Sequence, residues 1–140
     1  MSWQENLQIL DKLTTKEERA ICESEIVLDF MKTEVFTRLV KLKDELIEKG
    51  LMVELKPNHA DDIELPDVLV ELVVTKTVMD TLKYSARFHG RDHIQNGSLF
   101  IQGEIQRAKK QVSAFPSILI ASESISSIES YLKDFKEDFE

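Results

Sequence analysis

The feature that most constrains the fold of this chain is an apolar stripe of helical spacing between Thr15 and Lys49. Apolar residues recur there in steps of three and four, which places them on one face of an α-helix. The stripe consists of Leu28, Met31, Val35, Leu39, Leu42 and Leu46, and it is widened by Ile26, Phe30, Phe36, Val40 and Ile47. A stripe of this width predicts contact with more than one neighbouring element.

Both ends of the stretch carry the signals of a helix boundary. Thr15 stands three residues before Glu18, which is the capping-box pattern found where helices begin. Lys49 and Gly50 follow the last apolar residue. A cation suits the carboxyl end of a helix, and glycine adopts the positive φ that often follows it. The sequence therefore predicts one helix from Thr15 to Lys49.

A helix of this length exceeds what one small core needs. Its about 35 residues would span roughly 50 Å, whereas a compact core in a chain of this size measures roughly 20 Å across. Either the helix breaks near Glu23–Ser24, or part of its stripe projects and meets a partner. In the second case we expect a homodimer, with an interface formed by Leu28, Met31, Val35, Leu39, Leu42 and Leu46.

After Gly50 the spacing of apolar residues changes from helical to extended. The segment 68–75 is densely apolar and predicts a central strand covered on both faces. The Asn96-Gly97 dipeptide between apolar residues is the strongest hairpin signal. Residues 103–112 fit either a short helix or a strand. Further strands are predicted for segments with alternating or short apolar runs, at 51–56, 82–88 and 118–120.

The last segment is helical again, because Ile125, Ile128, Leu132, Phe135 and Phe139 follow steps of three and four after a Ser124 cap. This order of elements predicts an α+β fold. We expect a long N-terminal helix and a C-terminal helix packed on a mostly antiparallel sheet of four to five strands. The sequence contains no internal repeat, low-complexity tract or linker, so we expect a single domain over residues 1–140.

The charge balance narrows the class of partner. The chain has 18 basic and 26 acidic residues and a formal net charge of −8, which argues against indiscriminate binding to nucleic acid or anionic membranes. The single cysteine, Cys22, excludes an internal disulfide and fits a reducing compartment. There is no apolar run of roughly 20 residues and no export signal. We therefore expect a cytoplasmic protein without a membrane partner.

Charge is also segregated along the chain. Six bases stand against two acids between Lys83 and Lys110, so this segment carries +4 and the remainder −12. We predict a basic patch that meets phosphates or an acidic partner, formed by Lys83, Arg87, His89, Arg91, Arg107, Lys109 and Lys110. The alternative is that these bases pair across the sheet with the protein's own acids, Glu54 or Glu71.

Signatures of catalysis and metal binding are weak. His89 and His93 lie four residues apart, a spacing that places two imidazoles on one metal when the segment is helical. Gly90 predicts a loop there instead. The chain has no nucleophile elbow and no glycine-rich phosphate loop. We therefore expect no catalytic residue, no metal and no cofactor.

These patterns predict a non-catalytic protein-interaction module, which is to say a small acidic adaptor, chaperone-like or inhibitor protein. Its expected partner is another protein, and its expected self-association is a homodimer through the helical apolar surface. The alternative is a nucleic-acid or phosphorylated-ligand binder that uses the basic segment from Lys83 to Lys110. A third hypothesis is a small enzyme that uses the loop histidines His59, His89 or His93. The sequence contains no motif that identifies the partner.

Overall fold

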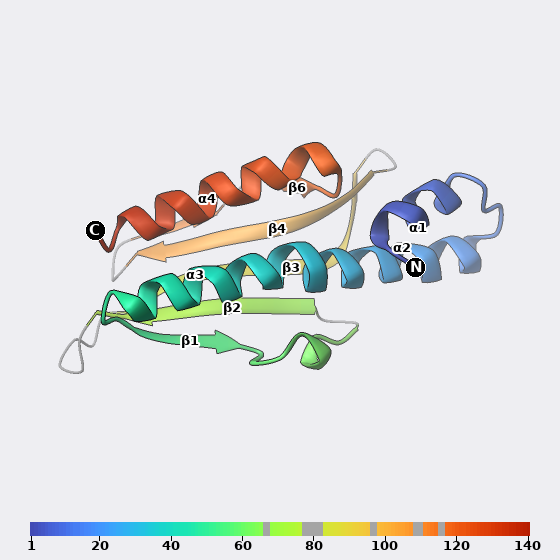
Figure 1. The fold of residues 1–140 in the computed structure, drawn as a ribbon. Coiled ribbons are helices and arrows are strands. Elements are labelled where there is room, and N and C mark those ends of the chain that lie inside the picture. The colour runs from blue at the N-terminus through green and yellow to red at the C-terminus, as the bar shows by residue number, and fades with distance from the viewer. Residues whose placement is uncertain (66–67, 77–82, 96–97, 108–110, 115–116) are drawn as a thin grey trace.

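The computed structural model describes residues 1–65, 68–76, 83–95, 98–107, 111–114 and 117–140. It is an α+β fold in which helices pack on one face of an antiparallel sheet, as predicted (Figure 1). The helical elements are α1 (Trp3–Leu10), α2 (Lys16–Phe30), a π-helical turn (Met31–Phe36), α3 (Thr37–Glu48) and α4 (Ile125–Glu137). The strands are β1 (Met52–Lys56), β2 (Val68–Thr75), β3 (Lys83–Gln95), β4 (Ser98–Arg107), β5 (Gln111–Ala114) and β6 (Ile118–Leu119).

The predicted long helix is helical throughout, but it is not uniform. The hydroxyl of Thr15 accepts a hydrogen bond from the backbone N–H of Glu18, and Gly50 has a φ of +87° just past the end. The expected break near Glu23–Ser24 is absent, because both residues lie within α2. The interruption comes later, at the π-helical turn, so the prediction of one regular α-helix slightly overstates its regularity.

Two threonines, one within the π-helical turn and one just after it, bond back to the preceding turn. The hydroxyl of Thr33 donates to the carbonyl of Asp29 at 2.8 Å, and the hydroxyl of Thr37 donates to the carbonyl of Thr33. Such bonds compete with the regular helical ladder and favour a local irregularity. The turn nevertheless keeps its apolar side chains in the core, where Met31, Val35 and Phe36 are all buried.

The amino-terminal half of α2 projects past the sheet, and α1 folds back over its apolar face (Figure 1). Trp3 is 1% exposed, and its ring meets Phe30 edge to face, with 5.0 Å between the centroids. Cys22 lies beneath α1, with its thiol 3.4 Å from the carbonyl oxygen of Asn6. Burial and then the charge of Glu25 raise the pKa of the Cys22 thiol. The projecting stripe is therefore covered by the chain's own amino terminus.

The sheet has strand order β1-β2-β3-β4-β5, and β6 pairs with β4 off this path. All of these pairings are antiparallel, as predicted. The hairpin is confirmed by Gln95 of β3 lying opposite Ser98 of β4, although Asn96 and Gly97 themselves lie outside the described residues. The ambiguous segment 103–112 contributes to two strands, since β4 continues to Arg107 and β5 starts at Gln111.

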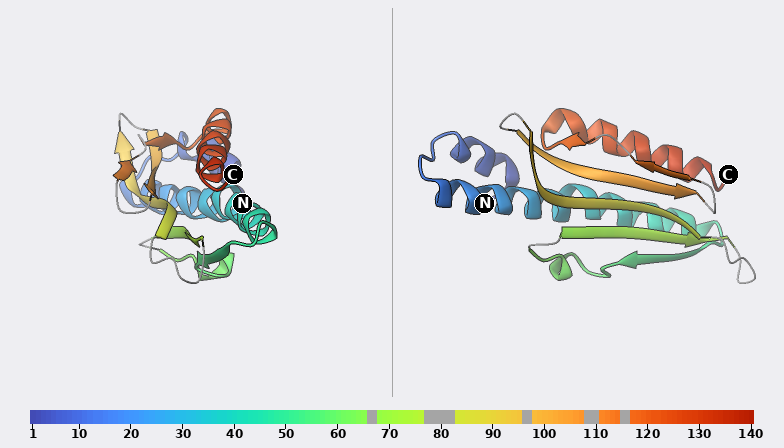
Figure 2. Two further views of the ribbon diagram at one scale, coloured as in Figure 1. Left: turned by 90° about the vertical axis from the view of Figure 1, so that its left-hand side faces the viewer. Right: turned by 180° about the vertical axis from the view of Figure 1, so that it is seen from behind.

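β2 is covered on one face only, so the prediction that both its faces are covered is wrong. Its inward residues are fully buried, whereas its outward residues are partly exposed. The reason is that α2, α3 and α4 all lie on the same side of the sheet, which curls around them (Figure 2). Among the described residues, no helix lies over the outer face. The inward residues of β2 are Val68, Val70, Leu72 and Val74, and the outward ones are Leu69, Glu71, Val73 and Thr75.

The predicted loop at His89–His93 is also wrong, because β3 runs through it. The strand continues from Lys83 to Gln95, with a shift of register between His89 and His93. Gly90 is buried in this strand, where a Cβ atom would lie 2.6 Å from Cγ1 of Val27. The glycine thus permits close approach of the helix to the sheet rather than marking a turn.

α4 lies beside α3 on the inner face of the sheet (Figure 1). Its predicted spacing is confirmed by the burial of Ile128, Leu132 and Phe135. Ser124 occupies the predicted N-cap position, but its side chain makes no capping hydrogen bond, because a 3-10 turn (Ser122–Ser124) leads into the helix. None of the described helices is long and apolar enough to cross a membrane.

Candidate binding surfaces

The predicted basic patch is only partly within the described structure. Arg87 and His89 lie on the outer face of β3, where Arg87 is exposed and His89 is half-buried. For Lys83, Arg91 and Arg107, the structure gives the strand position but not the surroundings of the side chain. Lys109 and Lys110 lie outside the described residues.

On the outer face, Arg87 stands in a row of alternating charges. The register places Lys56 of β1 beside Glu71 of β2, Glu71 beside Arg87 of β3, and Arg87 beside Glu104 of β4. We call these four residues the charge row. Nε of Arg87 lies 4.0 Å from a carboxylate oxygen of Glu71, so the predicted pairing with Glu71 is confirmed. Arg87 is balanced by acids on both neighbouring strands and does not by itself form a basic patch.

Glu54, the other predicted partner of the basic segment, pairs elsewhere. Its carboxylate lies 3.8 Å from the amine of Lys56 within β1. Apolar side chains are interspersed with these charges on the outer face. Leu69 and Val73 of β2 flank Glu71 and are half-exposed, as is Phe100 of β4. Leu119 of β6 is 39% exposed and lies beside Phe100. The outer face is therefore mixed in character, with apolar side chains between paired charges.

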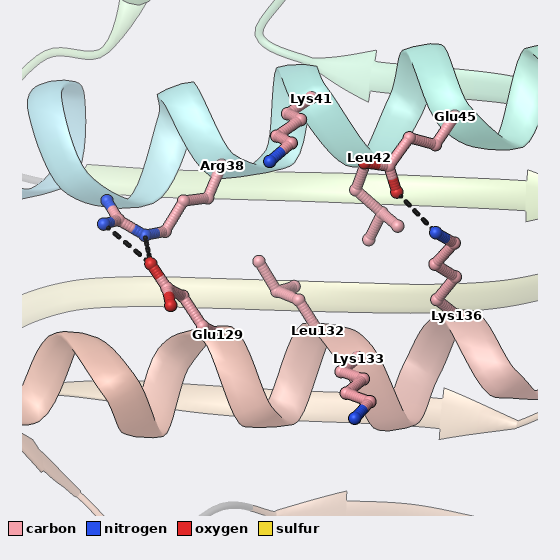
Figure 3. A pocket seen from close by; sticks show the side chains of 8 residues that line it. All are labelled: Arg38, Lys41, Leu42, Glu45, Glu129, Leu132, Lys133 and Lys136. Carbon is pink, nitrogen blue, oxygen red and sulfur yellow. Dashed lines mark hydrogen bonds and ion pairs between the residues drawn. The ribbon is translucent and has the colours of Figure 1, made fainter.

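A second surface, which the sequence did not reveal, is a groove of about 420 Å³ between α3 and α4 (Figure 3). An ion pair crosses it at each end. Nη2 of Arg38 lies 3.1 Å from Glu129, and Nζ of Lys136 lies 2.8 Å from Glu45. Between these two pairs the groove is lined by Lys41, Leu42, Leu132 and Lys133.

The ion pair of Glu45 and Lys136 alters the acidity of both groups. The hydrogen bond from Lys136 lowers the pKa of the Glu45 carboxyl below its ordinary value of 4.5. The same bond raises the pKa of the Lys136 amine above its ordinary value of 10.5. Both groups are therefore charged over the whole neutral range, and each neutralises the other.

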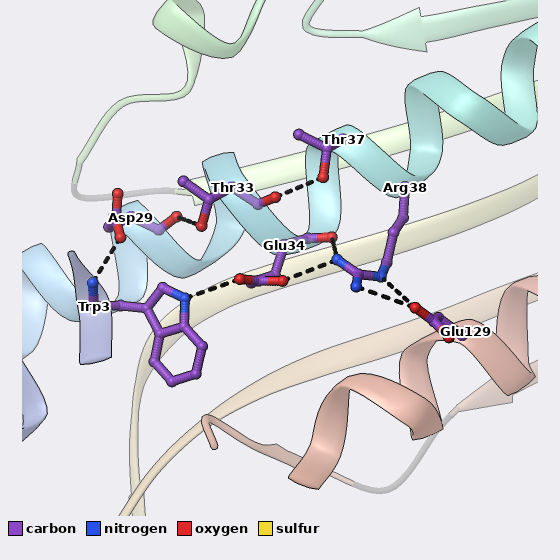
Figure 4. Close-up of polar contacts among 7 residues, drawn as sticks. All are labelled: Trp3, Asp29, Thr33, Glu34, Thr37, Arg38 and Glu129. Atoms are coloured by element: carbon purple, nitrogen blue, oxygen red, sulfur yellow. Dashed lines mark hydrogen bonds and ion pairs between the residues drawn. The ribbon is translucent and has the colours of Figure 1, made fainter. Parts of the chain in front are cut away.

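Arg38 is the centre of a hydrogen-bond network that links three parts of the chain (Figure 4). Its Nη1 donates to both the carbonyl and the carboxylate of Glu34, each at 2.9 Å. Its Nε and Nη2 donate to Glu129 of α4. The indole N–H of Trp3 donates to Glu34 at 3.2 Å, so α1 joins the same network. The guanidinium group of Arg38 is thus committed within the chain.

Lys41 and Lys133 are different. Both are exposed, and within the part of the chain that the structure describes neither makes an ion pair or a hydrogen bond. The eight lining residues include four bases and two acids, which leaves the groove with a formal charge of +2 on a chain whose net charge is −8. The floor of the groove is apolar, because Leu42 and Leu132 are 5% and 6% exposed.

The residues predicted as a homodimer interface lie in the chain's own core. The exposed fraction of Met31, Val35, Leu39 and Leu46 is 0%, Leu42 is 5% exposed, and Leu28 is half-buried. They therefore offer little surface to a second copy. Self-association remains a prediction, but this stripe no longer provides a reason for it.

The histidines are dispersed in the fold. His59 is exposed and precedes a 3-10 turn (Ala60–Asp62), whereas His89 lies on the outer face of the sheet. His93 lies further along β3, in register with Phe100 of β4. In the described segments, no three His, Cys, Asp or Glu residues are grouped so that they would hold a metal ion.

Comparison of the chain with models of protein families, with curated proteins and with solved structures finds no match. The functional interpretation therefore rests on the two surfaces described above, which are the outer face of the sheet and the groove between α3 and α4.

Proposed function

We propose that this chain is a non-catalytic protein-interaction module, namely a small acidic adaptor, chaperone-like or inhibitor protein, which binds another protein through the outer face of its sheet. The observation that supports this function is the one-sided covering of the sheet (Figure 2). The outer face presents half-exposed apolar side chains between charges that are already balanced. Protein-binding surfaces combine an apolar centre with polar groups in this way.

The apolar and charged groups contribute differently to such an interface. Covering Leu69 and Val73 removes apolar surface from water, which stabilises a complex by roughly 25 cal/mol for each Å² buried. The charge row contributes mainly to the orientation and choice of the partner, because placing like charges against each other in an interface costs on the order of several kcal/mol. A partner of this face therefore has apolar groups and an alternating arrangement of charges.

A second copy of the chain has that arrangement. A two-fold axis parallel to the strands, placed above the gap between β2 and β3, sets β2 of one copy against β3 of the other. Each Glu71 then faces the Arg87 of the other copy, and each Arg87 faces a Glu71. An axis across the strands would instead set Glu71 against Glu71, which is repulsive. We therefore propose a homodimer through the outer face, in place of the helical stripe, with an isologous interface.

The curvature of the sheet limits how much of the outer face contacts the second copy in the proposed dimer. The sheet curls around the helices, so its outer face is convex (Figure 2). Two convex faces meet along the central strands rather than over their whole width. The contact is therefore centred on Glu71 and Arg87 of β2 and β3, and Lys56 and Glu104 lie at its margin.

Charge exchange tests this arrangement. The Arg87→Glu chain carries acids at both central positions, and the Glu71→Arg chain carries bases at both. Each variant alone sets like charges face to face, so we expect both to be monomeric in sedimentation velocity over a concentration series. An equimolar mixture restores both opposed pairs, so we expect it to form a heterodimer.

Matched controls place the same changes of charge away from the sheet. Lys12 and Glu137 are exposed in the helical part of the chain, and Lys12→Glu and Glu137→Arg are expected to associate as the wild type does. The proposed homodimer is wrong if the wild-type chain remains monomeric at millimolar concentration. It is also wrong if the wild type associates while the equimolar mixture stays monomeric. In that case the charges of the row pair within one chain and not between two copies.

Binding of nucleic acid or a phosphorylated ligand through the basic segment remains an untested alternative. The balance of Arg87 by Glu71 and Glu104 argues against it for the described part of the segment. A decisive measurement is the salt dependence of binding to a short DNA duplex, since phosphate contacts weaken steeply as salt is raised. Loss of binding in the Arg87→Ala variant would favour this alternative over a protein partner.

A further inference from the structure

We infer that the groove between α3 and α4 is a docking site for an acidic segment of a partner protein. This site lies on the helical side of the molecule, away from the outer face of the sheet, and so it goes beyond the function proposed above. Three properties of the groove support the inference. Its lining has a positive formal charge, its floor is apolar, and the N–H groups of its arginine, Arg38, already make hydrogen bonds within the chain.

The first property is charge. Glu129 and Glu45, the two acids in the lining, are each paired across the groove, at 3.1 Å to Arg38 and 2.8 Å to Lys136. Of the four lining bases, Lys41 and Lys133 are the two that make no hydrogen bond or ion pair among the described residues (Figure 3). Because the whole chain carries −8, this groove is a local positive region on an acidic molecule. Such a region attracts carboxylates and disfavours cationic ligands.

The second property is the shape and chemistry between the lysines. Leu42 and Leu132 form an apolar floor (Figure 3), and the volume of about 420 Å³ lies within the range of roughly 300–1,000 Å³ that is common for binding sites. A ligand with an apolar side chain on this floor and carboxylates on either side of it would cover the two leucines and pair with Lys41 and Lys133. A peptide segment with an apolar residue between acidic residues provides this combination.

The third property decides between a carboxylate segment and a phosphate group. Phosphate sites in proteins commonly use the paired N–H groups of arginine, which bind two oxygens at once. Here the N–H groups of Arg38 are engaged by Glu34 and Glu129 (Figure 4). Two separate lysines act as point charges, which suits two separate carboxylates better than one phosphate.

Fluorescence anisotropy with a defined probe tests the inference. The probe is a labelled, capped peptide in which one central leucine has two glutamates before it and two glutamates after it. We expect it to bind the wild-type chain and to bind the double variant Lys41→Glu/Lys133→Glu at least about tenfold more weakly, because attraction is replaced by repulsion at both contacts. Binding to the wild type should also weaken as salt is raised.

Two control chains make the result specific. The double variant Lys12→Glu/Lys16→Glu changes the net charge by the same amount at exposed positions outside the groove, and it should bind the peptide as the wild type does. The double variant Lys41→Gln/Lys133→Gln should bind with intermediate affinity. Both lysines are exposed, and among the described residues neither makes a hydrogen bond or an ion pair. The charge of Lys41 acts on Glu45 less strongly than the hydrogen bond from Lys136 does, so these variants should change the unfolding midpoint only slightly.

The inference is overturned if the wild type does not bind the peptide at millimolar concentration. It is also overturned if the control variant Lys12→Glu/Lys16→Glu loses as much binding as the groove variant Lys41→Glu/Lys133→Glu. It is also overturned if inorganic phosphate displaces the peptide at concentrations similar to those of the unlabelled peptide. The outcome is independent of the proposed function, because the Glu71→Arg and Arg87→Glu chains should bind the peptide normally whether or not they dimerise.

Discussion

Gly90 lies in β3 directly beneath the long helix, at a point where a larger residue does not fit. A Cβ atom there would be 2.6 Å from Cγ1 of Val27 and 3.2 Å from Cγ of Met31. The first of these distances is far below normal contact, and valine is branched at Cβ, so its methyl group has little freedom to move away. The absence of a side chain at Gly90 therefore sets how closely α2 and the π-helical turn approach the sheet.

We predict that Gly90→Ala lowers the free energy of unfolding by roughly 1–3 kcal/mol, the usual cost of overpacking a core. Urea denaturation followed by circular dichroism measures this loss. Ser85→Ala is the matched control in the same strand, because Ser85 faces the outer side and its replacement should change stability by less than about 0.5 kcal/mol. Equal stability of wild type and Gly90→Ala would show that the helix can shift without cost.

At the same scale, the Glu45–Lys136 pair predicts a defined pH dependence. The pKa of Glu45 is lowered in the folded chain, so its contribution to stability is present above its ordinary value of 4.5 and is lost as pH falls through the folded pKa. The pKa of Lys136 is raised, so its contribution is lost only as pH rises through its own folded pKa, above 10.5.

We therefore predict that Glu45→Gln lowers the thermal unfolding midpoint at neutral pH and that the difference from wild type shrinks as pH falls below 4.5 and disappears once Glu45 is protonated in the folded chain. Differential scanning calorimetry across this range gives the two curves. Glu137→Gln is the control, since Glu137 is exposed on the same helix as Lys136 and should show no such convergence. A constant difference at all pH values would assign the effect to shape rather than to charge.

At the scale of elements, Trp3 combines packing with two hydrogen bonds to hold α1 against the long helix. Trp3 is 1% exposed and packs on Phe30. Its backbone N–H donates to Asp29 at 2.7 Å, and its indole N–H donates to Glu34 (Figure 4). α1 is short, so this tertiary packing, and not intrinsic helix propensity, stabilises it.

We predict that Trp3→Ala destabilises the chain by about 3–5 kcal/mol, the range for removing a large buried aromatic side chain. It should also expose the connection at residues 11–14 to limited proteolysis before the rest of the chain is cut. Trp3→Phe keeps a ring against Phe30 and loses the bond to Glu34 and part of the buried volume, so its effect should be smaller than that of Trp3→Ala. If Trp3→Ala leaves the proteolysis pattern unchanged, other contacts hold α1 in place.

The elements themselves were largely predictable, because each has a local signal. Helical spacing and caps indicated the long helix and α4, alternation indicated β1, and the Asn96-Gly97 dipeptide indicated the pairing of β3 with β4. The errors occurred where one residue type serves two purposes. Gly90 suggests a turn by its residue type, although it permits close packing here. The dense apolar run of β2 suggests covering on both faces, although none of the described helices lies on its second face.

At the scale of the whole molecule, the two faces of the sheet differ in burial. Leu72 is 0% exposed on the inner face, whereas its neighbour Val73 is half-exposed on the outer face. We predict that Leu72→Ala lowers the free energy of unfolding by about 2–5 kcal/mol. Val73→Ala should have a much smaller effect on folding of the monomer and should instead weaken self-association in sedimentation velocity. The reverse pattern would contradict the proposed use of the outer face.

The candidate surfaces were less predictable than the fold because they depend on tertiary register. The charges of Lys56, Glu71, Arg87 and Glu104 are visible in the sequence, but their alternation appears only when four strands are aligned. The groove combines residues of α3 and α4 that are about ninety positions apart, such as Arg38 and Glu129. Sequence periodicity gives the buried face of each helix, but not which charged side chains meet across the gap.

The balance of the charge row also has a consequence for the way two molecules would approach each other. Each chain carries −8, so two copies repel at long range, whereas the row contains two bases and two acids and is neutral as a whole. Copies that approach with acidic surfaces facing each other repel, so the neutral charge row is a less opposed route of encounter. Dissolved ions shorten the reach of this repulsion. Added salt should therefore speed the meeting of two copies, the opposite of its effect on an encounter between oppositely charged proteins.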